Sequence, residues 1–206
     1  MRIRTPPGRA GRLWLMRRLE VAERGYDVLD EKRQALLREE ERSRVRALRA
    51  ERDWAESAAE ARRWLVRAAL LGGERAVGLA RFYAGDQARV EIAWRNTLGV
   101  VHPAEATLAL PLARRTEAFV GTSALVQCTE AHRRALEAAA ALAVARRSHE
   151  RVAAELERTI RRLQAIERRW LPHHRQALES LELRLDEEER EEALRLRWAS
   201  RRGTGT

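Results

Sequence analysis

Cysteine, lysine and aromatic residues are scarce in this sequence of 206 residues, and each shortage excludes a class of protein. The single cysteine, Cys128, cannot form an intrachain disulfide, which excludes a disulfide-stabilised fold and fits a reducing compartment. The only lysine, Lys32, follows Glu31 within a helical pattern, and this excludes a P-loop ending in Gly-Lys-Ser/Thr. Aromatic residues make up 5% of the chain, which argues against a thick globular core.

Motifs of common catalytic and metal sites are missing as well. The sequence contains no Gly-x-Ser-x-Gly, His-Glu-x-x-His or Cys-x-x-Cys. Cys128 and His132 are one helical turn apart, but no second pair of ligands completes a site, so we expect a buried cysteine and a surface histidine. His173 and His174 are adjacent on a predicted helix and point in different directions, and we expect both at the surface. The sequence predicts no catalytic, cofactor-binding or metal-binding residue.

Long apolar runs are also absent. The Ala-rich run from Ala138 to Ala145 is far shorter than the roughly 20 residues that span a bilayer. The opening residues, Met1 to Gly8, lack the apolar core of a signal peptide. We therefore expect a cytoplasmic protein without direct membrane insertion, which reaches a membrane only through a partner.

Charged and small apolar residues dominate the chain. Charged residues make up 35% and apolar residues 45%, and much of the apolar content is Ala and Leu. This composition indicates long helices and coiled coil. The formal net charge of +10 is almost entirely arginine. Such a surface can bind nucleic acid, anionic lipid or an acidic protein, and charge alone does not choose among them.

A 4,3,4,3 spacing predicts one long coiled-coil helix over residues 13–71, after a loose N-terminal arm at residues 1–12. At about 1.5 Å per residue, a helix over most of this range is roughly 85 Å long. The seam is apolar at its ends and more polar in its middle. Its members are Leu15, Leu19, Ala22, Tyr26, Leu29, Arg33, Leu36, Glu40, Ser43, Ala47, Ala50, Trp54, Ser57, Ala61, Trp64, Ala68 and Leu71.

A second coiled-coil helix is predicted over residues 122–200, with Thr122 or Ser123 as its N-cap and a loose tail at 201–206. Pro172 removes one backbone hydrogen bond inside this helix and predicts a kink. Its apolar face is formed by Val152, Leu156, Ile160, Leu163, Ile166, Trp170, Ala177, Leu181 and Leu185.

The middle segment, residues 72–121, is richer in glycine and contains two stretches with period-two alternation. Residues 88–94 and 106–110 read as a short β-hairpin, with residues 99–103 in the connection. Two long amphipathic helices most simply pack as an antiparallel pair. The predicted fold is therefore mainly α, a long antiparallel two-helix coiled coil with a short β-hairpin in its middle segment.

Five ordered motifs spread over nearly the whole chain resemble one family, the D subunits of V-type and archaeal-type ATPases. The first is the opening stretch from Thr5 to Gly25, and the second is its continuation from Tyr26 to Leu36, which is similar to "GxxLLKxKRxxL". The remaining motifs are Arg95-Asn-Thr-Leu-Gly-Val-Val-His-Pro103, Thr159-Ile-Arg-Arg-Leu-Gln-Ala-Ile-Glu167 with Pro172, and Leu185-Asp-Glu-Glu-Glu-Arg-Glu-Glu192. Asp30, Leu163-Gln164 and Arg197 depart from the family's pattern.

The resemblance implies a non-catalytic central stalk, or rotor axle, that couples ATP hydrolysis or synthesis in a catalytic ring to rotation of a membrane ion-translocating ring. The implied partners are the catalytic A and B subunits, a small F-type stalk subunit, and a funnel-shaped subunit that docks on the membrane rotor ring. Nucleic acid and cofactors are not among them. The resemblance also implies that the paired chain ends enter the catalytic ring.

The basic residues near these ends are the predicted contacts with the catalytic ring: Arg9, Arg12, Arg17, Arg18, Arg197, Arg201 and Arg202. Two alternative functions do not depend on the resemblance to this family. A coiled-coil scaffold would function alone or as a homodimer. A basic helical hairpin associated with nucleic acid would bind DNA or RNA in a salt-sensitive manner.

Overall fold

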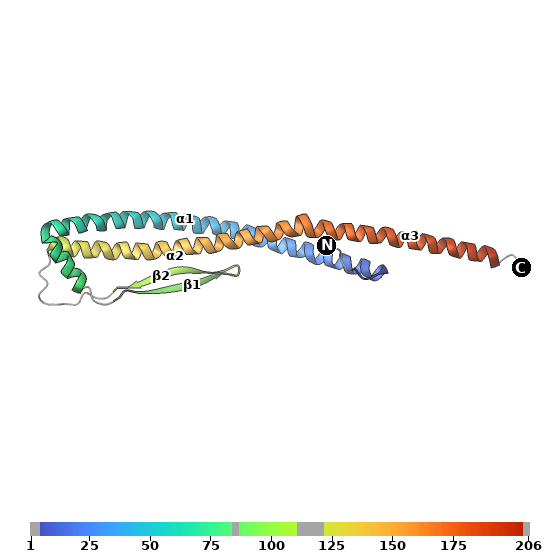
Figure 1. The fold of residues 1–206 in the computed structure, drawn as a ribbon, viewed down its shortest axis with the longest axis horizontal. Coiled ribbons are helices and arrows are strands. Elements are labelled where there is room, and N and C mark those ends of the chain that lie inside the picture. The colour runs from blue at the N-terminus through green and yellow to red at the C-terminus, as the bar shows by residue number, and fades with distance from the viewer. Residues whose placement is uncertain (1–4, 84–86, 111–121, 204–206) are drawn as a thin grey trace. The chain divides into compact units, whose positions relative to one another are not determined.

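The computed structural model describes residues 5–83, 87–110 and 122–203, and the side chains of residues 80–83 and 201–203 lie outside that description. The elements, in chain order, are α1 (Gly8–Tyr83), β1 (Arg89–Thr97), β2 (Val100–Ala109), α2 (Ser123–Ala165), the π-helical turn η1 (Ile166–Trp170) and α3 (Leu171–Gly203) (Figure 1). The mainly helical fold with a two-stranded hairpin is confirmed. The chain divides into two compact units: unit 1 comprises residues 1–34 and 157–206, and unit 2 comprises residues 35–156.

Unit 1 pairs the beginning of α1 with the end of α2, η1 and α3. Three ion pairs connect the two segments, and their order along the chain shows that the segments are antiparallel: Glu23 with Arg175, Arg12 with Glu182, and Arg9 with Glu189. The core of this unit contains leucines from both segments, among them Leu15, Leu19, Leu163, Leu171 and Leu181. Most of these were predicted from the spacing of three and four residues.

The start of α1 packs closely against α3. The helix begins at Gly8, within the stretch expected to be a loose arm. Gly11 is buried, and a Cβ at this position would collide with the carbonyl oxygen of Pro6 and lie 3.3 Å from Leu181 Cδ2. Glycine is therefore required here by close approach, and the first turns of α1 belong to the packed helix pair.

The irregularity expected at Pro172 takes the form of a π-helical turn. The N–H of Leu171 donates to the carbonyl of Ile166, five residues earlier. Pro172 has no N–H to offer the preceding turn, so the regular helical ladder is interrupted there. A π-turn accommodates that interruption while the helix continues as α3.

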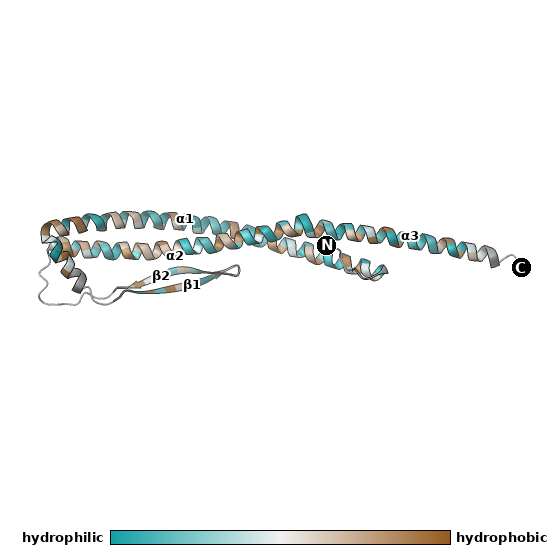
Figure 2. Ribbon diagram, in the orientation of Figure 1, coloured by the Kyte–Doolittle hydropathy of each residue, from teal (hydrophilic) through white to brown (hydrophobic). Residues whose placement is uncertain are grey.

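Unit 2 contains a second antiparallel segment of the helix pair. Glu51 binds Arg146 at 2.6 Å, and Glu60 binds Arg134 at 3.3 Å. Almost every predicted seam position of α1 is buried or half-buried in its unit, which confirms the spacing. Trp54 and Leu71 are exceptions, at 40% and 71% exposure. Polar and apolar residues alternate along the helices, as amphipathic packing requires (Figure 2).

The first helix extends past its predicted end but is broken at Gly73. Gly73 has φ 76° and ψ 159°, a conformation that glycine adopts easily and that ends the regular helix. The following residues form further turns up to Tyr83. Val77, after the break, packs against a small cluster formed by Ala68, Ala124, Leu125 and Cys128. Leu71 is exposed because the break follows the last buried seam position.

The hairpin is longer and its turn tighter than predicted. Thr97 pairs with Val100, so only Leu98 and Gly99 form the turn, both with positive φ as in a type I′ turn. The expectation of a connection over residues 99–103 was wrong, because it took Pro103 as a loop residue. Pro103 instead lies in β2 opposite Trp94, next to a bulge, where a missing N–H does not interrupt the ladder.

Candidate interaction surfaces

The predicted contact residues near the N-terminus are largely engaged within unit 1. The guanidinium of Arg9 donates to Glu189 Oε1 at 2.7 Å, and Arg12 Nε donates to Glu182 Oε1 at 2.7 Å. The hydrogen bond to Glu189 raises the pKa of Arg9 above its usual value. All four side chains remain substantially exposed, so each pair adds little stability but holds the register of α1 against α3.

Arg18 is held in an aromatic stack. Its guanidinium carbon lies 4.6 Å from the ring centroid of Trp14 and 5.7 Å from that of Trp170. Trp170 in turn stacks on His174, with centroids 3.6 Å apart. His174 is 6% exposed, so the prediction of a surface position was wrong for this residue. The spacing of Trp14 and Arg18 was visible in the sequence, but the partner ring comes from a distant helix.

Arg17 and Arg18 line a shallow cleft of about 300 Å³ in unit 1. Its other lining residues are Trp14, Val21, Ala22 and Trp170, so the cleft combines apolar walls with two cations. Arg17 and Arg18 therefore lie together, on a different part of α1 from the ion pairs of Arg9 and Arg12.

The basic residues of the C-terminus lie beyond the paired region of unit 1. Glu189 is opposite the first turn of α1, and every described residue from 186 to 200 is exposed. Arg197 lies eight residues past Glu189, about 12 Å farther along α3. The side chains of Arg201 and Arg202 lie outside the described residues. Among the residues whose side chains are described, the predicted contacts thus occupy several places along unit 1 and do not form one patch.

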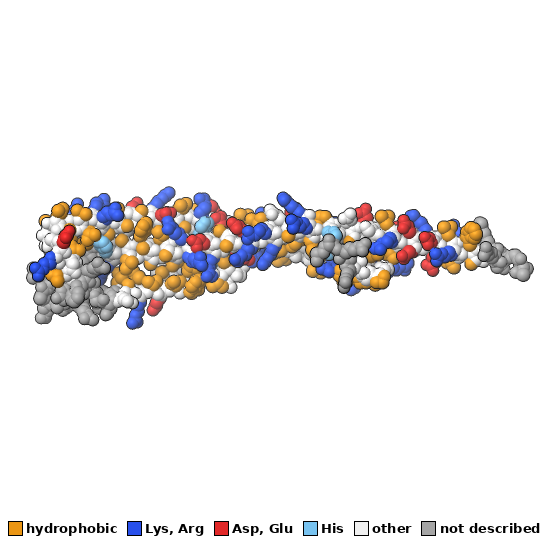
Figure 3. Space-filling model, in the orientation of Figure 1, with side chains coloured by type: hydrophobic (Ala, Val, Ile, Leu, Met, Phe, Trp, Pro, Cys, Tyr) orange, Lys and Arg blue, Asp and Glu red, His pale blue; other side chains and the backbone are white. Residues whose placement is uncertain are grey.

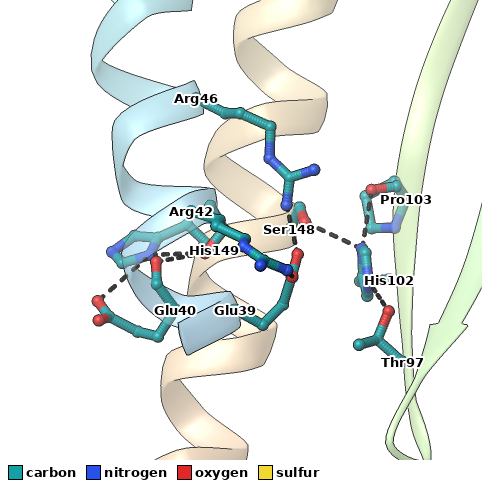
Figure 4. A network of polar contacts seen from close by, with 10 residues as sticks. Glu39, Glu40, Arg42, Arg46, Thr97, His102, Pro103, Ser148 and His149 are labelled. Atoms are coloured by element: carbon teal, nitrogen blue, oxygen red, sulfur yellow. Dashed lines mark hydrogen bonds and ion pairs between the residues drawn. The ribbon is translucent and has the colours of Figure 1, made fainter. Parts of the chain in front are cut away.

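In unit 2, a buried histidine fastens the hairpin to α2. His102 is 2% exposed, and its Nδ1 lies 2.9 Å from Ser148 Oγ on α2 and 3.2 Å from the carbonyl oxygen of Pro103 (Figure 4). Its Nε2 lies 3.1 Å from Thr97 Oγ1. With the hydrogen on Nδ1, the ring donates to the Pro103 carbonyl and the Ser148 hydroxyl oxygen and accepts from the Thr97 hydroxyl; with the hydrogen on Nε2, it donates to Thr97 and accepts from Ser148. The sequence offered no signal for this role.

A second contact fastens the same strand to α2. Arg151 Nη1 donates to the carbonyl of Val101 at 2.8 Å, and its guanidinium carbon lies 5.4 Å from the ring centroid of Trp94. Together with His102, Arg151 places the β2 side of the hairpin against α2. The hairpin is therefore an ordered part of unit 2.

The polar middle of the predicted seam is also explained in unit 2. Ser43 is 1% exposed, and its hydroxyl donates to the carbonyl of Glu40 at 2.8 Å. His149 of α2 approaches the same hydroxyl at 3.3 Å and the Glu40 carboxylate at 3.7 Å (Figure 4). Ser43 and Glu40 of the seam thus share one polar partner across the helix pair, His149, in addition to the bond within α1.

Groups that could support metal chemistry are not brought together in the part of the chain that the structure describes. Cys128 is buried, and this burial raises the pKa of its thiol. His132 is exposed, as expected, and its Nδ1 lies 2.8 Å from the carbonyl of Cys128. None of the helices within the described ranges combines the length and the apolar content that crossing a bilayer requires.

Comparisons with known proteins agree on one family. The family model described as that of the ATP synthase D subunit matches residues 13–201. The D subunit of the A-type ATP synthase of Methanopyrus kandleri is 33% identical over 193 residues, which cover 93% of this chain and 83% of that protein. The corresponding protein of Thermococcus gammatolerans is 33% identical, covering 93% and 91% of the two chains. That of Pyrococcus abyssi is 32% identical, covering 95% and 92%. With a family match over most of its length and such relatives along nearly the whole chain, this protein belongs to the family of ATP synthase D subunits.

Proposed function

We propose that this chain is the central stalk of an A-type ATP synthase, the rotor axle that couples ATP hydrolysis or synthesis in a catalytic ring to rotation of a membrane ion-translocating ring. Family membership makes the chain a subunit of an ATP synthase complex. In this role the chain has no catalytic site of its own. It is cytoplasmic and attached to the membrane through the other subunits.

The antiparallel helix pair is the observation that carries this proposal. An axle has to transmit torque, and a single helix twists and bends more easily than two helices packed along a common seam. In each unit the seam is buried, and ion pairs across it oppose sliding of one helix along the other. Side-chain packing of this kind resists deformation, because packed interiors transmit strain.

The chain ends are the proposed contact with the catalytic A and B subunits. Residues 190–200 continue past the start of α1 as an exposed helical segment, which includes Leu194, Leu196 and Trp198 at 53%, 66% and 67% exposure. Large apolar side chains exposed in this way favour a protein partner. We assign the ring contacts to this segment and to Arg9, Arg12, Arg17, Arg18, Arg197, Arg201 and Arg202.

The end of the unit 2 helix pair that includes the break at Gly73 is the proposed contact with the funnel-shaped subunit on the membrane ring. Four apolar side chains near the break at Gly73 and the start of α2 are more than half exposed: Val66, Leu70, Leu71 and Val126. The hairpin side of unit 2 is assigned to the small F-type stalk subunit. Both assignments rest on the exposure of apolar side chains, which favours a protein partner where several lie together.

Reconstitution with the neighbouring subunits tests the function. The chain should co-purify with the A and B subunits, show no ATP hydrolysis alone, and rotate when it carries a bead in an ATP-driven single-molecule assay. Reversing the charge of Arg17 and Arg18 together should weaken ring assembly or slow rotation. Unchanged rotation would refute the assignment of these two residues, and a chain that never joins the ring would refute the function.

A further inference from the structure

The two strands of the hairpin differ in what covers their outer edges. The outer edge of β2 faces α2, where Arg151 donates to the Val101 carbonyl and Ser148 contacts His102. β1 pairs with β2 on one side and has no strand on the other within the described residues. Eight of its nine residues are exposed. Within the described ranges, the outer side of β1 is therefore an open sheet edge.

The register shows which backbone groups this edge presents. In a hairpin with a two-residue loop, the closing pair Thr97 and Val100 exchanges hydrogen bonds, and bonding then alternates along the strands. This alternation predicts that the carbonyl of Val101 points away from β1. The contact agrees with it, because Arg151 donates to this carbonyl from outside the sheet. By the same alternation, Val90, Ile92 and Trp94 direct their N–H and C=O groups outward from β1.

Several features that protect edge strands from pairing are missing from β1, although it carries the charged residues Arg89, Glu91 and Arg95. β1 contains no proline, glycine or lysine. The bulge places its extra residue, Ala104, on β2, so the edge of β1 stays regular. Val90, Ile92 and Trp94 are 52%, 46% and 55% exposed, and hydrophobic side chains gather over the hairpin on the face shown in Figure 3.

We infer that β1 adds a strand from another subunit of the complex, which extends the two-stranded sheet to three strands. This inference rests on the proposed function. Backbone groups aligned on an open edge select an extended segment. Its side chains on one face would be apolar, against Val90, Ile92 and Trp94. On the other face of β1, Arg89 and Arg95 outnumber the single acid Glu91. The added strand would therefore place acidic side chains on that face, opposite the two arginines.

In the self-pairing register that overlaps Val90, Ile92 and Trp94 of both copies, the charges on β1 disfavour a second copy of this chain. In antiparallel self-pairing centred on Ile92, Arg89 of each copy faces Arg95 of the other. Like charges directly opposite each other destabilise a strand pair. An acidic strand from another subunit reverses that effect.

Hydrogen exchange read residue by residue tests the pairing. In the isolated chain, the outward amides of Val90, Ile92 and Trp94 should exchange freely, while the inward amides of Glu91 and Arg95 are protected. In the assembled complex, the three outward amides should slow by at least about tenfold. Protection already present in the isolated chain would overturn the inference, because the edge is then covered by the same chain or, if protection rises with concentration, by a second copy.

Two variants of one residue separate the backbone from the side chain. Ile92→Pro removes an outward N–H and leaves the bonds to β2, whereas Ile92→Ala keeps the N–H and shortens the side chain. The proline variant should weaken assembly about tenfold relative to the alanine variant, as expected for loss of a backbone contact. Exchange at Glu91 and Arg95 verifies that the hairpin is intact in both variants.

The outcomes distinguish this inference from the function. A complex that assembles while the outward amides stay unprotected, or in which both Ile92 variants bind equally, overturns strand addition and leaves the stalk function standing. A wild-type chain that fails to assemble overturns both.

Discussion

Removing the imidazole of His102 should detach the hairpin from α2 without melting the helix pair. His102→Ala leaves the buried hydroxyl of Ser148 and the hydroxyl of Thr97 without this partner. A net hydrogen bond contributes about 0.5–1.5 kcal/mol and an unsatisfied buried group costs about 1–3 kcal/mol, so we expect a loss of roughly 2–3 kcal/mol. Such a loss raises the detached population about 30-fold or more.

Amide exchange in the hairpin reports this detachment, since a lone two-stranded hairpin is marginally stable in water. The inward amides of Glu91 and Arg95 should exchange about 30-fold faster in His102→Ala. Thermal unfolding of the helices, followed by circular dichroism, should change little. His132→Ala, which removes an exposed histidine from α2, is the matched control. Unchanged exchange at the hairpin, or an equal loss in the control, would refute the role of His102.

Three further predictions concern packing, backbone conformation and reactivity. Leu15 is 0% exposed, so Leu15→Ala should lower the unfolding free energy by about 3 kcal/mol in urea titrations, whereas Leu13→Ala, at a position 54% exposed, should cost less than about 1 kcal/mol. Gly73 has a positive φ, so Gly73→Ala should destabilise by about 1 kcal/mol; Gly78→Ala, with open space around its Cβ inside a helical turn, should stabilise by up to about 1 kcal/mol. If the two glycine variants shift the melting temperature in the same direction, the reasoning on Gly73 fails. Burial and a raised pKa leave little accessible thiolate at Cys128, so iodoacetamide should label it slowly in the native chain and rapidly in urea, and equal rates would contradict its burial.

The helices and their seam could be predicted from the sequence because helical periodicity is a local property. Leu15, Leu36 and Ala68 recur at the spacing that keeps them on one face, and each is buried. The same spacing placed Trp54 and Leu71 in the seam, where the structure leaves them exposed. Periodicity states which face a residue occupies, but not whether the partner helix offers a surface opposite it.

The contacts between distant segments could not be predicted in the same way. The expectation that His174 is surrounded by solvent was wrong, because its ring stacks on Trp170, which belongs to the π-helical turn before Pro172. His102 lies within one of the family motifs, but the motif indicates no role for its side chain. Its role depends on the contact with Ser148, which lies 46 positions later in the chain. Such pairings depend on register between helices and strands, which no local pattern specifies.

Residue type and spacing alone determined the mainly helical fold, the existence of a hairpin and, through the ordered motifs, the family. Tertiary structure decided how the arginines near the chain ends are used: Arg9 and Arg12 in ion pairs, Arg18 between two tryptophan rings, and Arg197 on a segment past the helix pair. The physical reason is that an arginine side chain is long and always charged, so its role depends on which carboxylate or ring the fold brings within its reach.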